Sequence, residues 1–241
     1  DHGSDGAMLI SHADAALYRA KEQGRGRFAY YSDDLTRYAR ERIDLEGRLR
    51  AALKAGQFRV YYQPQVELST GQIVGAEALI RWQDPVEGLI PPGRFIPIAE
   101  DTGLIGPIGD WVLAETCRQG AQWLDAGLAP VKLAVNLSSH QFTQGNISER
   151  TAEILQQSGF PAELLELELT ESAIMERELE ASVLLTELHQ MGVNLAIDDF
   201  GTGYSSFAYL QRYRLDVLKI DKSFMDDVEF NPESRAIVSA I

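Results

Sequence analysis

The chain has 241 residues, of which 45% are hydrophobic and 24% charged, a composition typical of a globular protein and not of a disordered, collagen-like or coiled-coil chain. Lysine and arginine number 22 against 36 aspartates and glutamates, and the resulting net charge of −14 argues against a nucleic-acid-coating surface, because phosphate binding needs clustered positive charge. The longest stretch without Asp, Glu, Lys or Arg, 133–148, is rich in Asn, Ser and Gln, so neither a membrane span nor a signal peptide is predicted.

The chain contains a single cysteine, Cys117, which excludes an internal disulfide and indicates a reducing compartment such as the cytoplasm. Cys117 lies in a helical pattern with Leu113 and Trp123. A packed and unreactive thiol is therefore expected.

Helical patterns dominate the first part of the chain. Residues 11–21 are predicted to form an alanine-rich helix, and 27–31 a short strand. Residues 34–55 then form a second helix, which carries three leucines spaced four apart on one stripe: Leu45, Leu49 and Leu53. This stripe predicts a linking helix that packs against the following domain, and a dimerising helix is the alternative.

From residue 58 onward, strand and helix patterns alternate. Residues 58–66 and 72–82 are predicted to form a hairpin around a Ser-Thr-Gly turn. Strands are then expected at 131–137, 164–170, 193–198 and 217–221, and helices at 108–126, 148–158, 178–191, 205–212 and from 232 onward. Such alternation implies an α/β fold in which helices cover parallel strands, and the spacing suits either a (β/α) barrel or an open sheet.

Polar residues recur near the ends of the predicted strands, on the faces opposite their aliphatic residues: Glu77, Asn136, Glu168, Asp198, Asp199 and Lys219. The carboxyl ends of barrel strands are where active sites are assembled. Each residue alone has an ordinary explanation as a solvated rim carboxylate, a turn or cap residue, or an ion-pair partner.

Taken together, these residues predict a cation site. Several carboxylates in one mouth would repel one another, which would raise their pKa values unless cations lay between them. Hard oxygen ligands select Mg²⁺ or Mn²⁺, and two adjacent ions stabilise the attacking and leaving oxygens of a phosphoryl displacement. The glycine-rich stretch 201–206, directly after the Asp-Asp pair, is flexible enough to approach a ligand closely.

Residues 57–241 closely resemble an EAL domain, the bacterial family that hydrolyses cyclic di-GMP. The namesake motif is Glu77-Ala78-Leu79, within "GAEALIRW". The other motifs follow in order: "YYQPQV" upstream of it, then "PGRFIPIAEDTGLI", "VNLSS", "LELELTES", "IDDFGTGYSS" and "LKIDKSF". The resemblance implies a TIM-like (β/α)8 barrel with an antiparallel first strand, and an incomplete one of about six strands, because the seventh-strand metal-binding glutamate and eighth-strand glutamine of the family are not in the chain.

The resemblance also implies a role for each matching residue. The ligands of one metal ion are then Glu77, Asn136, Glu168 and Asp198, and Asp198 and Asp199 serve a second ion. Lys219 matches the lysine that holds the attacking water, and Glu171 the glutamate that steadies the loop 199–206. Arg81 matches a residue that contacts a substrate phosphate. Gln63 and Leu79 match residues that line the substrate pocket.

The opening segment, "ADAALYRAKEQGRGRFAYYS", resembles the last helix and strand of a GGDEF (diguanylate cyclase) domain, without the turn that carries cyclase chemistry. We therefore expect three parts: a GGDEF remnant at 1–33, a linking helix at 34–55 and an EAL domain at 56–241.

The function that the resemblance implies for the parent protein is hydrolysis of cyclic di-GMP to linear 5′-pGpG by two-metal-assisted attack of hydroxide, with Mg²⁺ or Mn²⁺ as cofactor. A span without the last two βα units of the barrel is expected to be impaired in this activity. The alternative is a degenerate EAL domain that binds cyclic di-GMP as a sensor without cutting it. An unrelated barrel that uses the carboxylates for enolate chemistry is a third hypothesis. Members of the family often pair, which suggests a homodimer; no nucleic-acid polymer and no membrane contact are expected as partners.

Overall fold

The computed structural model describes residues 28–143, 146–176, 178–201, 213–226 and 228–240, together with isolated residues among the first 17. Most of the glycine-rich loop and the short helix predicted at 205–212 lie outside these ranges. Residues 28–32 are described and have no regular structure, so the strand predicted up to residue 31 is wrong there. A strand needs a partner to satisfy its backbone groups, and no described strand pairs with this segment.

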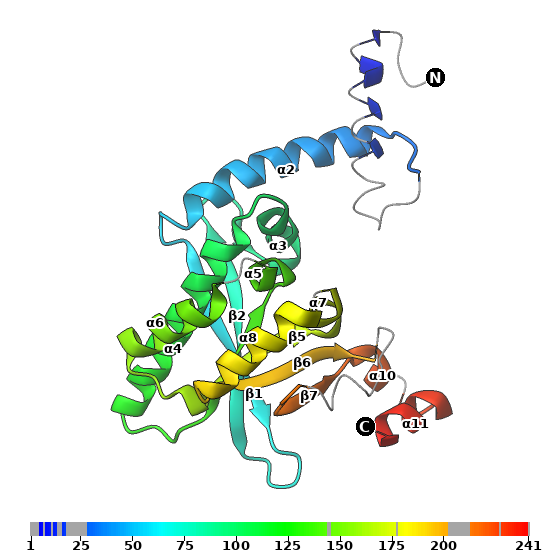
Figure 1. Cartoon of the computed structure of the whole chain (residues 1–241). Coiled ribbons are helices and arrows are strands. Elements are labelled where there is room, and N and C mark those ends of the chain that lie inside the picture. The colour runs from blue at the N-terminus through cyan, green and yellow to red at the C-terminus, as the bar shows by residue number, and fades with distance from the viewer. Residues whose placement is uncertain are drawn as a thin grey trace.

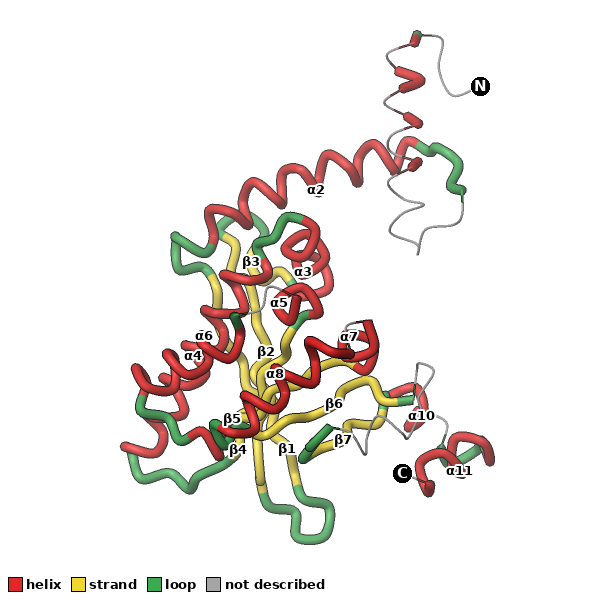
Figure 2. Tube along the Cα trace, viewed as in Figure 1, coloured by secondary structure: helices red, strands yellow, loops and turns green. Residues whose placement is uncertain are grey.

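One sheet holds all the strands that the structure describes (Figures 1 and 2). The hairpin strands β1 (Phe58–Val66) and β2 (Ile73–Asp84) are antiparallel, and the short β3 (Gly88–Ile90) also pairs antiparallel with β2. The remaining strands follow β2 in parallel and in chain order: β4 (Lys132–Leu137), β5 (Leu165–Thr170), β6 (Asn194–Phe200) and β7 (Val217–Ile220). This arrangement confirms the predicted barrel-like α/β fold with an antiparallel first strand, and in the described residues β1 and β7 are not paired with each other.

Helices α4 (Ile105–Asp125), α6 (Ile147–Ser158) and α8 (Glu178–Gln190) lie along one face of the sheet, its outer face (Figure 1). These three helices and α11 (Pro232–Ala240) lie close to the predicted ranges. The shorter elements were not predicted from the sequence: α3 (Pro92–Asp101), α5 (Ser139–Thr143), η1 (Ala162–Leu164), α7 (Glu171–Glu176) and α10 (Lys222–Asp226). Of these, α3 contains two prolines and a glycine. Pro92 stands in the first turn, where a proline N–H is not needed, whereas Pro97 lies inside the helix.

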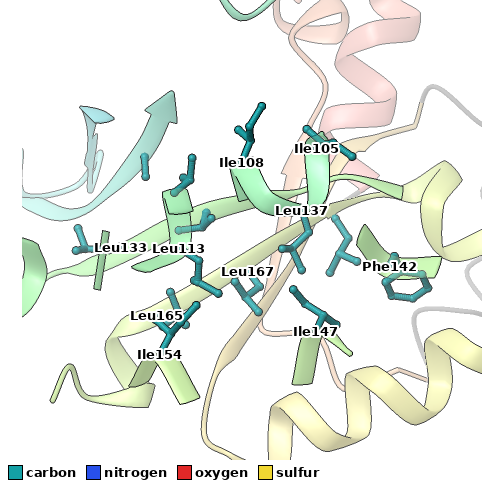
Figure 3. Packing of buried hydrophobic residues seen from close by; sticks show 14 of the residues in the cluster. Ile105, Ile108, Leu113, Leu133, Leu137, Phe142, Ile147, Ile154, Leu165 and Leu167 are labelled. Carbon is teal, nitrogen blue, oxygen red and sulfur yellow. The ribbon is translucent and has the colours of Figure 1, made fainter. Parts of the chain in front are cut away.

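The hydrophobic core lies between the sheet and these helices (Figure 3). The outward-facing residues of β4 and β5 are buried against aliphatic side chains of α4 and α6, as residue alternation predicts: Leu133, Val135, Leu137, Leu165, Leu167 and Leu169 from the strands, and Ile108, Leu113 and Ile154 from the helices. The opposite face of each strand is therefore left for polar residues, inside the curve of the sheet.

Helix α2 (Asp33–Ala52) joins the core at its C-terminal end. Leu45 and Leu49 are buried, which confirms the predicted packing of the leucine stripe. Arg48, between them, donates a hydrogen bond of 2.8 Å to the carboxylate of Asp84 at the end of β2, whose side chain is only 1% exposed. Arg48 also pairs with Glu87. The second half of α2 is therefore fixed to the same strand that carries Glu77.

We expect Leu49→Ala to lower the free energy of unfolding by about 2–5 kcal/mol, because the substitution leaves a cavity in a closely packed core. Ile43→Ala, on the same helix but 70% exposed, is the matched control and should change it by less than about 0.5 kcal/mol. Urea unfolding of both variants measures the difference. Equal effects would show that the inner stripe of α2 does not contribute to the core.

The thiol of Cys117 is fully buried on α4, and burial raises its pKa to about 12. A thiol with a raised pKa stays protonated at neutral pH, and only the thiolate is nucleophilic. We therefore expect no reaction with a disulfide reagent such as dithionitrobenzoate in the folded protein and complete reaction in denaturant. Rapid labelling of the folded protein would contradict this expectation.

Candidate active site

The central feature of the inner face is a lysine surrounded by carboxylates. The Nζ atom of Lys219, on β7, lies 2.6 Å from Oε2 of Glu168. It also lies 3.2 Å from Oε2 of Glu77 and 3.2 Å from Oδ2 of Asp198. Because these residues come from β7, β5, β2 and β6, the parallel strands bring four distant parts of the sequence to one point.

Asn136 completes this group. Its Nδ2 donates a hydrogen bond of 2.7 Å to Oε1 of Glu77, and in the sheet register Asn136 lies opposite Glu168. We call Glu77, Asn136, Glu168, Asp198 and Lys219 the inner cluster. All five were predicted as site residues from the sequence, and the structure brings all five together.

Burial dominates the electrostatics of the inner cluster. The side chain of Glu168 is fully buried, and burial raises its pKa to about 7 although the hydrogen bond from Lys219 opposes this shift. Burial, the largest contribution, acts to lower the pKa of Lys219, but the hydrogen bond to Glu168 and the negative charges of the three carboxylates outweigh it, so its pKa is raised. Repulsion from Glu77 and Asp198 also raises the pKa of Glu168, but it is a smaller effect than burial, whereas the sequence analysis considered repulsion alone.

Asp199 directly follows Asp198 of the inner cluster, and the backbone there departs from a regular strand. The pairing of β6 with β7 shifts register between Ile197 and Phe200, and Asp199 has a φ of +55°. A bulge of this kind re-aims side chains that strict alternation would send to opposite faces. The backbone N–H of Asp199 donates to Oδ1 of Asp198 at 2.9 Å, and burial, then the charge of Asp198, raises the pKa of Asp199.

Asp221 is a polar neighbour that the sequence analysis missed. It follows Lys219 by two residues, and hydrogen bonds from Ser223 lower its pKa. The neighbouring carboxyl groups of Asp199 and Asp221 also shift each other's pKa, raising that of Asp199 and lowering that of Asp221. The motif "LKIDKSF" could have indicated this residue, because alternation places Asp221 on the same face as Lys219.

Glu171 begins α7 directly after β5 and is mostly buried. Its Oε2 accepts a hydrogen bond of 3.3 Å from the backbone N–H of Gly201, at the start of the glycine-rich loop. Gly201 has a φ of +99°, and a Cβ atom there would lie 2.8 Å from the ring of Phe224. Glycine is therefore required at this point, and the contact places Glu171 against the first residue of the loop.

The three predicted substrate residues lie on the hairpin. Gln63 of β1 is paired in register with Glu77, and Leu79 and Arg81 follow Glu77 on β2. The guanidinium of Arg81 lies 5.5 Å from the ring centre of Tyr61, a cation–π contact that the sequence analysis did not anticipate. Arg81 also donates to the backbone oxygen of Ile80 at 2.8 Å. These contacts fix the side chain of Arg81 on β2, four residues after Glu77 of the inner cluster.

A largely apolar cavity of about 270 Å³ opens next to the inner cluster. Leu79 and Asn136 belong to its wall, together with Ile96 of α3 and Ile108 of α4. Glu100, also in the wall, is half-buried, and burial raises its pKa. The cavity can therefore take a flat, partly apolar group within reach of the polar cluster.

The oxygen donors of the inner cluster are of the type that Mg²⁺ and Mn²⁺ prefer. The Oε1 atom of Glu168 is buried without a hydrogen-bond partner, so one oxygen of the cluster is left available to a cation. Among the described residues, however, no group of three acidic, histidine or cysteine side chains is arranged to hold an ion. The ammonium of Lys219 lies among the oxygens instead.

The model of the EAL domain family matches residues 46–241. The chain belongs to the EAL domain family. In relatives of this family the similarity extends over nearly the whole chain: the bifunctional diguanylate cyclase/cyclic di-GMP phosphodiesterase MucR of Pseudomonas aeruginosa is 45% identical over 97% of the chain, and the cyclic di-GMP phosphodiesterase PdeR of Escherichia coli is 40% identical over 100%.

The chain spans only about a third of these EAL relatives, 34% of MucR and 36% of PdeR. Among solved EAL structures, the PaMucR phosphodiesterase in complex with c-di-GMP superposes with a TM-score of 0.79 at 45% identity, covering 82% of this chain and 80% of that one.

No helix in the described residues is both long and apolar enough to cross a membrane.

Proposed function

We propose that this EAL domain hydrolyses cyclic di-GMP to linear 5′-pGpG with the help of two divalent ions, Mg²⁺ or Mn²⁺. The observation that carries the proposal is that the carboxylates of Glu77, Glu168 and Asp198 converge on the ammonium group of Lys219. Asn136 is hydrogen-bonded to Glu77 in the same cluster. Support comes from the two curated relatives named as cyclic di-GMP phosphodiesterases and from the solved phosphodiesterase complex with c-di-GMP.

The inner cluster fits the ions that the proposal requires. Glu77, Asn136, Glu168 and Asp198 would hold the first ion through oxygen atoms, and Asp198 with Asp199 the second. Bound ions would activate the attacking water and neutralise charge on the phosphodiester. The carboxylates of these residues would supply the negative charge that attracts two divalent ions. The chain as a whole is also negative, with a net charge of −14.

The remaining residues of the site would position the attacking water, the substrate and the glycine-rich loop. We assign to Lys219 the positioning of the attacking water, because its ammonium lies at the centre of the cluster and donates hydrogen bonds. Arg81 would contact a substrate phosphate, since its guanidinium is held on the same face of β2 as Glu77. Glu171 would steady the glycine-rich loop through its bond to Gly201.

The cavity beside the cluster suits one guanine base of the substrate. Its walls are apolar, including Leu79, Ile96 and Ile108, while Glu100 and Asn136 supply polar groups that can accept guanine N–H donors. Gln63, which is paired with Glu77 in the sheet register, would line the substrate pocket on the β1 side.

We expect Ile96→Trp, which fills this cavity, to raise KM for cyclic di-GMP about tenfold with little change in kcat, because it removes binding that the ground state and transition state share. Val86→Trp introduces the same side chain at a position 78% exposed and is the matched control. Steady-state kinetics of both variants measures the effect. A KM equal to that of the control would exclude the cavity from substrate binding.

The proposal is tested by incubating the purified parent protein with cyclic di-GMP and either Mg²⁺ or Mn²⁺, with a chelator as control, and separating the nucleotides chromatographically. We expect conversion to 5′-pGpG in the presence of an ion and none with the chelator. Binding of cyclic di-GMP without product would instead identify a sensor domain, and the absence of both would overturn the assignment of substrate.

The rest of the chain is assigned on the same basis. We propose that 1–33 is the end of a GGDEF domain, 34–55 a linking helix and 56–241 the EAL domain. Similarity to MucR, a bifunctional diguanylate cyclase, over 97% of the chain supports this division, although the EAL model itself begins at residue 46. A cytoplasmic location and a homodimer are further proposals that rest on the family alone.

A further inference from the structure

Arg81 is a basic residue of the inner face that has no carboxylate partner. Among the described residues, no aspartate or glutamate forms an ion pair with its guanidinium. In a chain with 36 acidic and 22 basic residues, a guanidinium left without a carboxylate is available to an anionic ligand. Its direction therefore depends on two other contacts, the backbone oxygen of Ile80 and the ring of Tyr61.

The sheet register places a second arginine directly opposite Arg81. Arg59 of β1 is paired with Arg81 of β2, and like charges in directly opposed positions repel each other. The Nη1 atom of Arg59 donates hydrogen bonds of 2.8 Å to the backbone oxygen of Gly56 and 2.6 Å to that of Phe58, at the start of the hairpin. The guanidinium of Arg59 is therefore held there, and repulsion favours a direction of Arg81 that leads away from it.

Tyr61 lies on the side of Arg81 that leads to the inner cluster. Along the hairpin, the register pair of Tyr61 with Leu79 stands between the two arginines and the pair that contains Glu77. Diagonal neighbours across an antiparallel pair are within reach of aromatic and long side chains. The guanidinium carbon of Arg81 lies 5.5 Å from the ring centre of Tyr61, and the face of an aromatic ring attracts a cation. The ring therefore draws the guanidinium along the strand toward Glu77.

The ring of Tyr61 has no role in the core. The residue is 50% exposed, whereas the next residue, Tyr62, packs against Trp123 on the opposite face. In the part of the chain that the structure describes, the hydroxyl group of Tyr61 has no hydrogen-bond partner. The aromatic face, in contact with Arg81, is therefore the part of this side chain that acts on its surroundings.

We propose that Tyr61 is a positioning residue that directs the guanidinium of Arg81 toward a phosphate of the substrate. An aromatic ring suits this task, because an arginine stacked on it keeps its N–H groups free for bidentate bonds to phosphate oxygens. A carboxylate in the same place would neutralise the guanidinium and repel the phosphate. This inference rests on the proposed function, in which Arg81 contacts a substrate phosphate.

The test is a double-mutant cycle that measures KM and kcat for cyclic di-GMP with Mn²⁺, using the purified parent protein, Tyr61→Ala, Arg81→Met and the double variant. We expect Tyr61→Ala to raise KM about fivefold and to leave kcat within about twofold, because it weakens binding that the ground state and transition state share. In the Arg81→Met background, where no guanidinium has to be directed, the same replacement should change KM by less than about twofold.

Two further variants show which part of Tyr61 acts. Tyr61→Phe keeps the ring and removes the hydroxyl group, so its KM should stay within about twofold of the unsubstituted protein. Tyr30→Ala removes a tyrosine that is 78% exposed and precedes α2, and it serves as the matched control with an unchanged KM. Equilibrium binding of cyclic di-GMP replaces KM if Arg81→Met turns over too slowly to be measured.

The possible results separate the hypotheses. An equal rise of KM in both backgrounds would mean that Tyr61 contacts the substrate itself, and an unchanged KM would mean that its ring does not direct Arg81. A Tyr61→Phe variant as impaired as Tyr61→Ala would assign the effect to the hydroxyl group. Each of these results overturns the positioning role while the proposed function stands. Failure of the unsubstituted parent protein to bind or hydrolyse cyclic di-GMP would overturn the proposed function as well. Thermal unfolding of each variant checks folding, and Tyr61→Leu replaces Tyr61→Ala if the latter is unfolded.

Discussion

Replacing Lys219 by methionine is expected to lower kcat for cyclic di-GMP hydrolysis by about 10² or more, the effect of removing one electrostatic group from a transition state. Mn²⁺ binding should be retained, because methionine removes a cation that uses the same three carboxylates as the ion. Steady-state kinetics at saturating Mn²⁺, with a calorimetric titration in parallel, measures the two quantities separately. The combination of lost turnover with retained binding is the specific expectation.

The matched control is Lys222→Met, three residues further along the chain, whose side chain is 85% exposed and pairs only loosely with Asp226. Its kcat should stay within about twofold of the unsubstituted protein, since exposed ion pairs contribute little. Normal turnover by Lys219→Met would remove Lys219 from the reaction and leave it as a structural ion-pair partner.

Asp199→Asn is expected to reduce kcat by about 10² or more and to shift the Mn²⁺ requirement to higher concentrations, because it removes a charged ligand assigned to the second ion. Asparagine is chosen because Asp199 has a φ of +55°, and asparagine tolerates this left-handed conformation. Asp199→Ala would add a stability cost of about 1–2 kcal/mol from the backbone alone, which urea unfolding can measure.

Asp226→Asn removes the same charge from a side chain that is 64% exposed and serves as the control for Asp199→Asn. We expect it to leave both kcat and the Mn²⁺ requirement unchanged. An Asp199→Asn variant with the same Mn²⁺ dependence as this control would contradict the assignment of Asp199 to a second ion.

Much of the site could be predicted from the sequence, because it depends on a regular property of strands. Alternation places Asn136, Glu168 and Asp198 on the faces opposite the buried aliphatic residues, and parallel pairing then brings their strand ends together. The same reasoning, applied to helices, predicted the buried stripe of Leu45 and Leu49 on α2.

The parts that could not be predicted depend on irregular backbone or on charge competition. The register shift between Ile197 and Phe200, which contains Asp198 and Asp199, is a local irregularity that alternation cannot anticipate. The helix α3, with Pro97 in its interior, contradicts its local propensity and is stabilised by burial of Phe95 and Ile98. The sequence also could not show that Lys219 pairs with three carboxylates at once, since that contact depends on the depth to which its long side chain reaches.

The central claim is that the inner cluster is a divalent-metal centre, and the most direct measurement is an anomalous difference map from crystals of the protein grown with Mn²⁺ and recorded at the manganese absorption edge. We predict a peak bounded by Glu77, Asn136, Glu168 and Asp198, with the Lys219 ammonium withdrawn from those oxygens. Crystals that contain bound cyclic di-GMP but show no peak there, with Nζ of Lys219 still among the three carboxylates, would contradict the account.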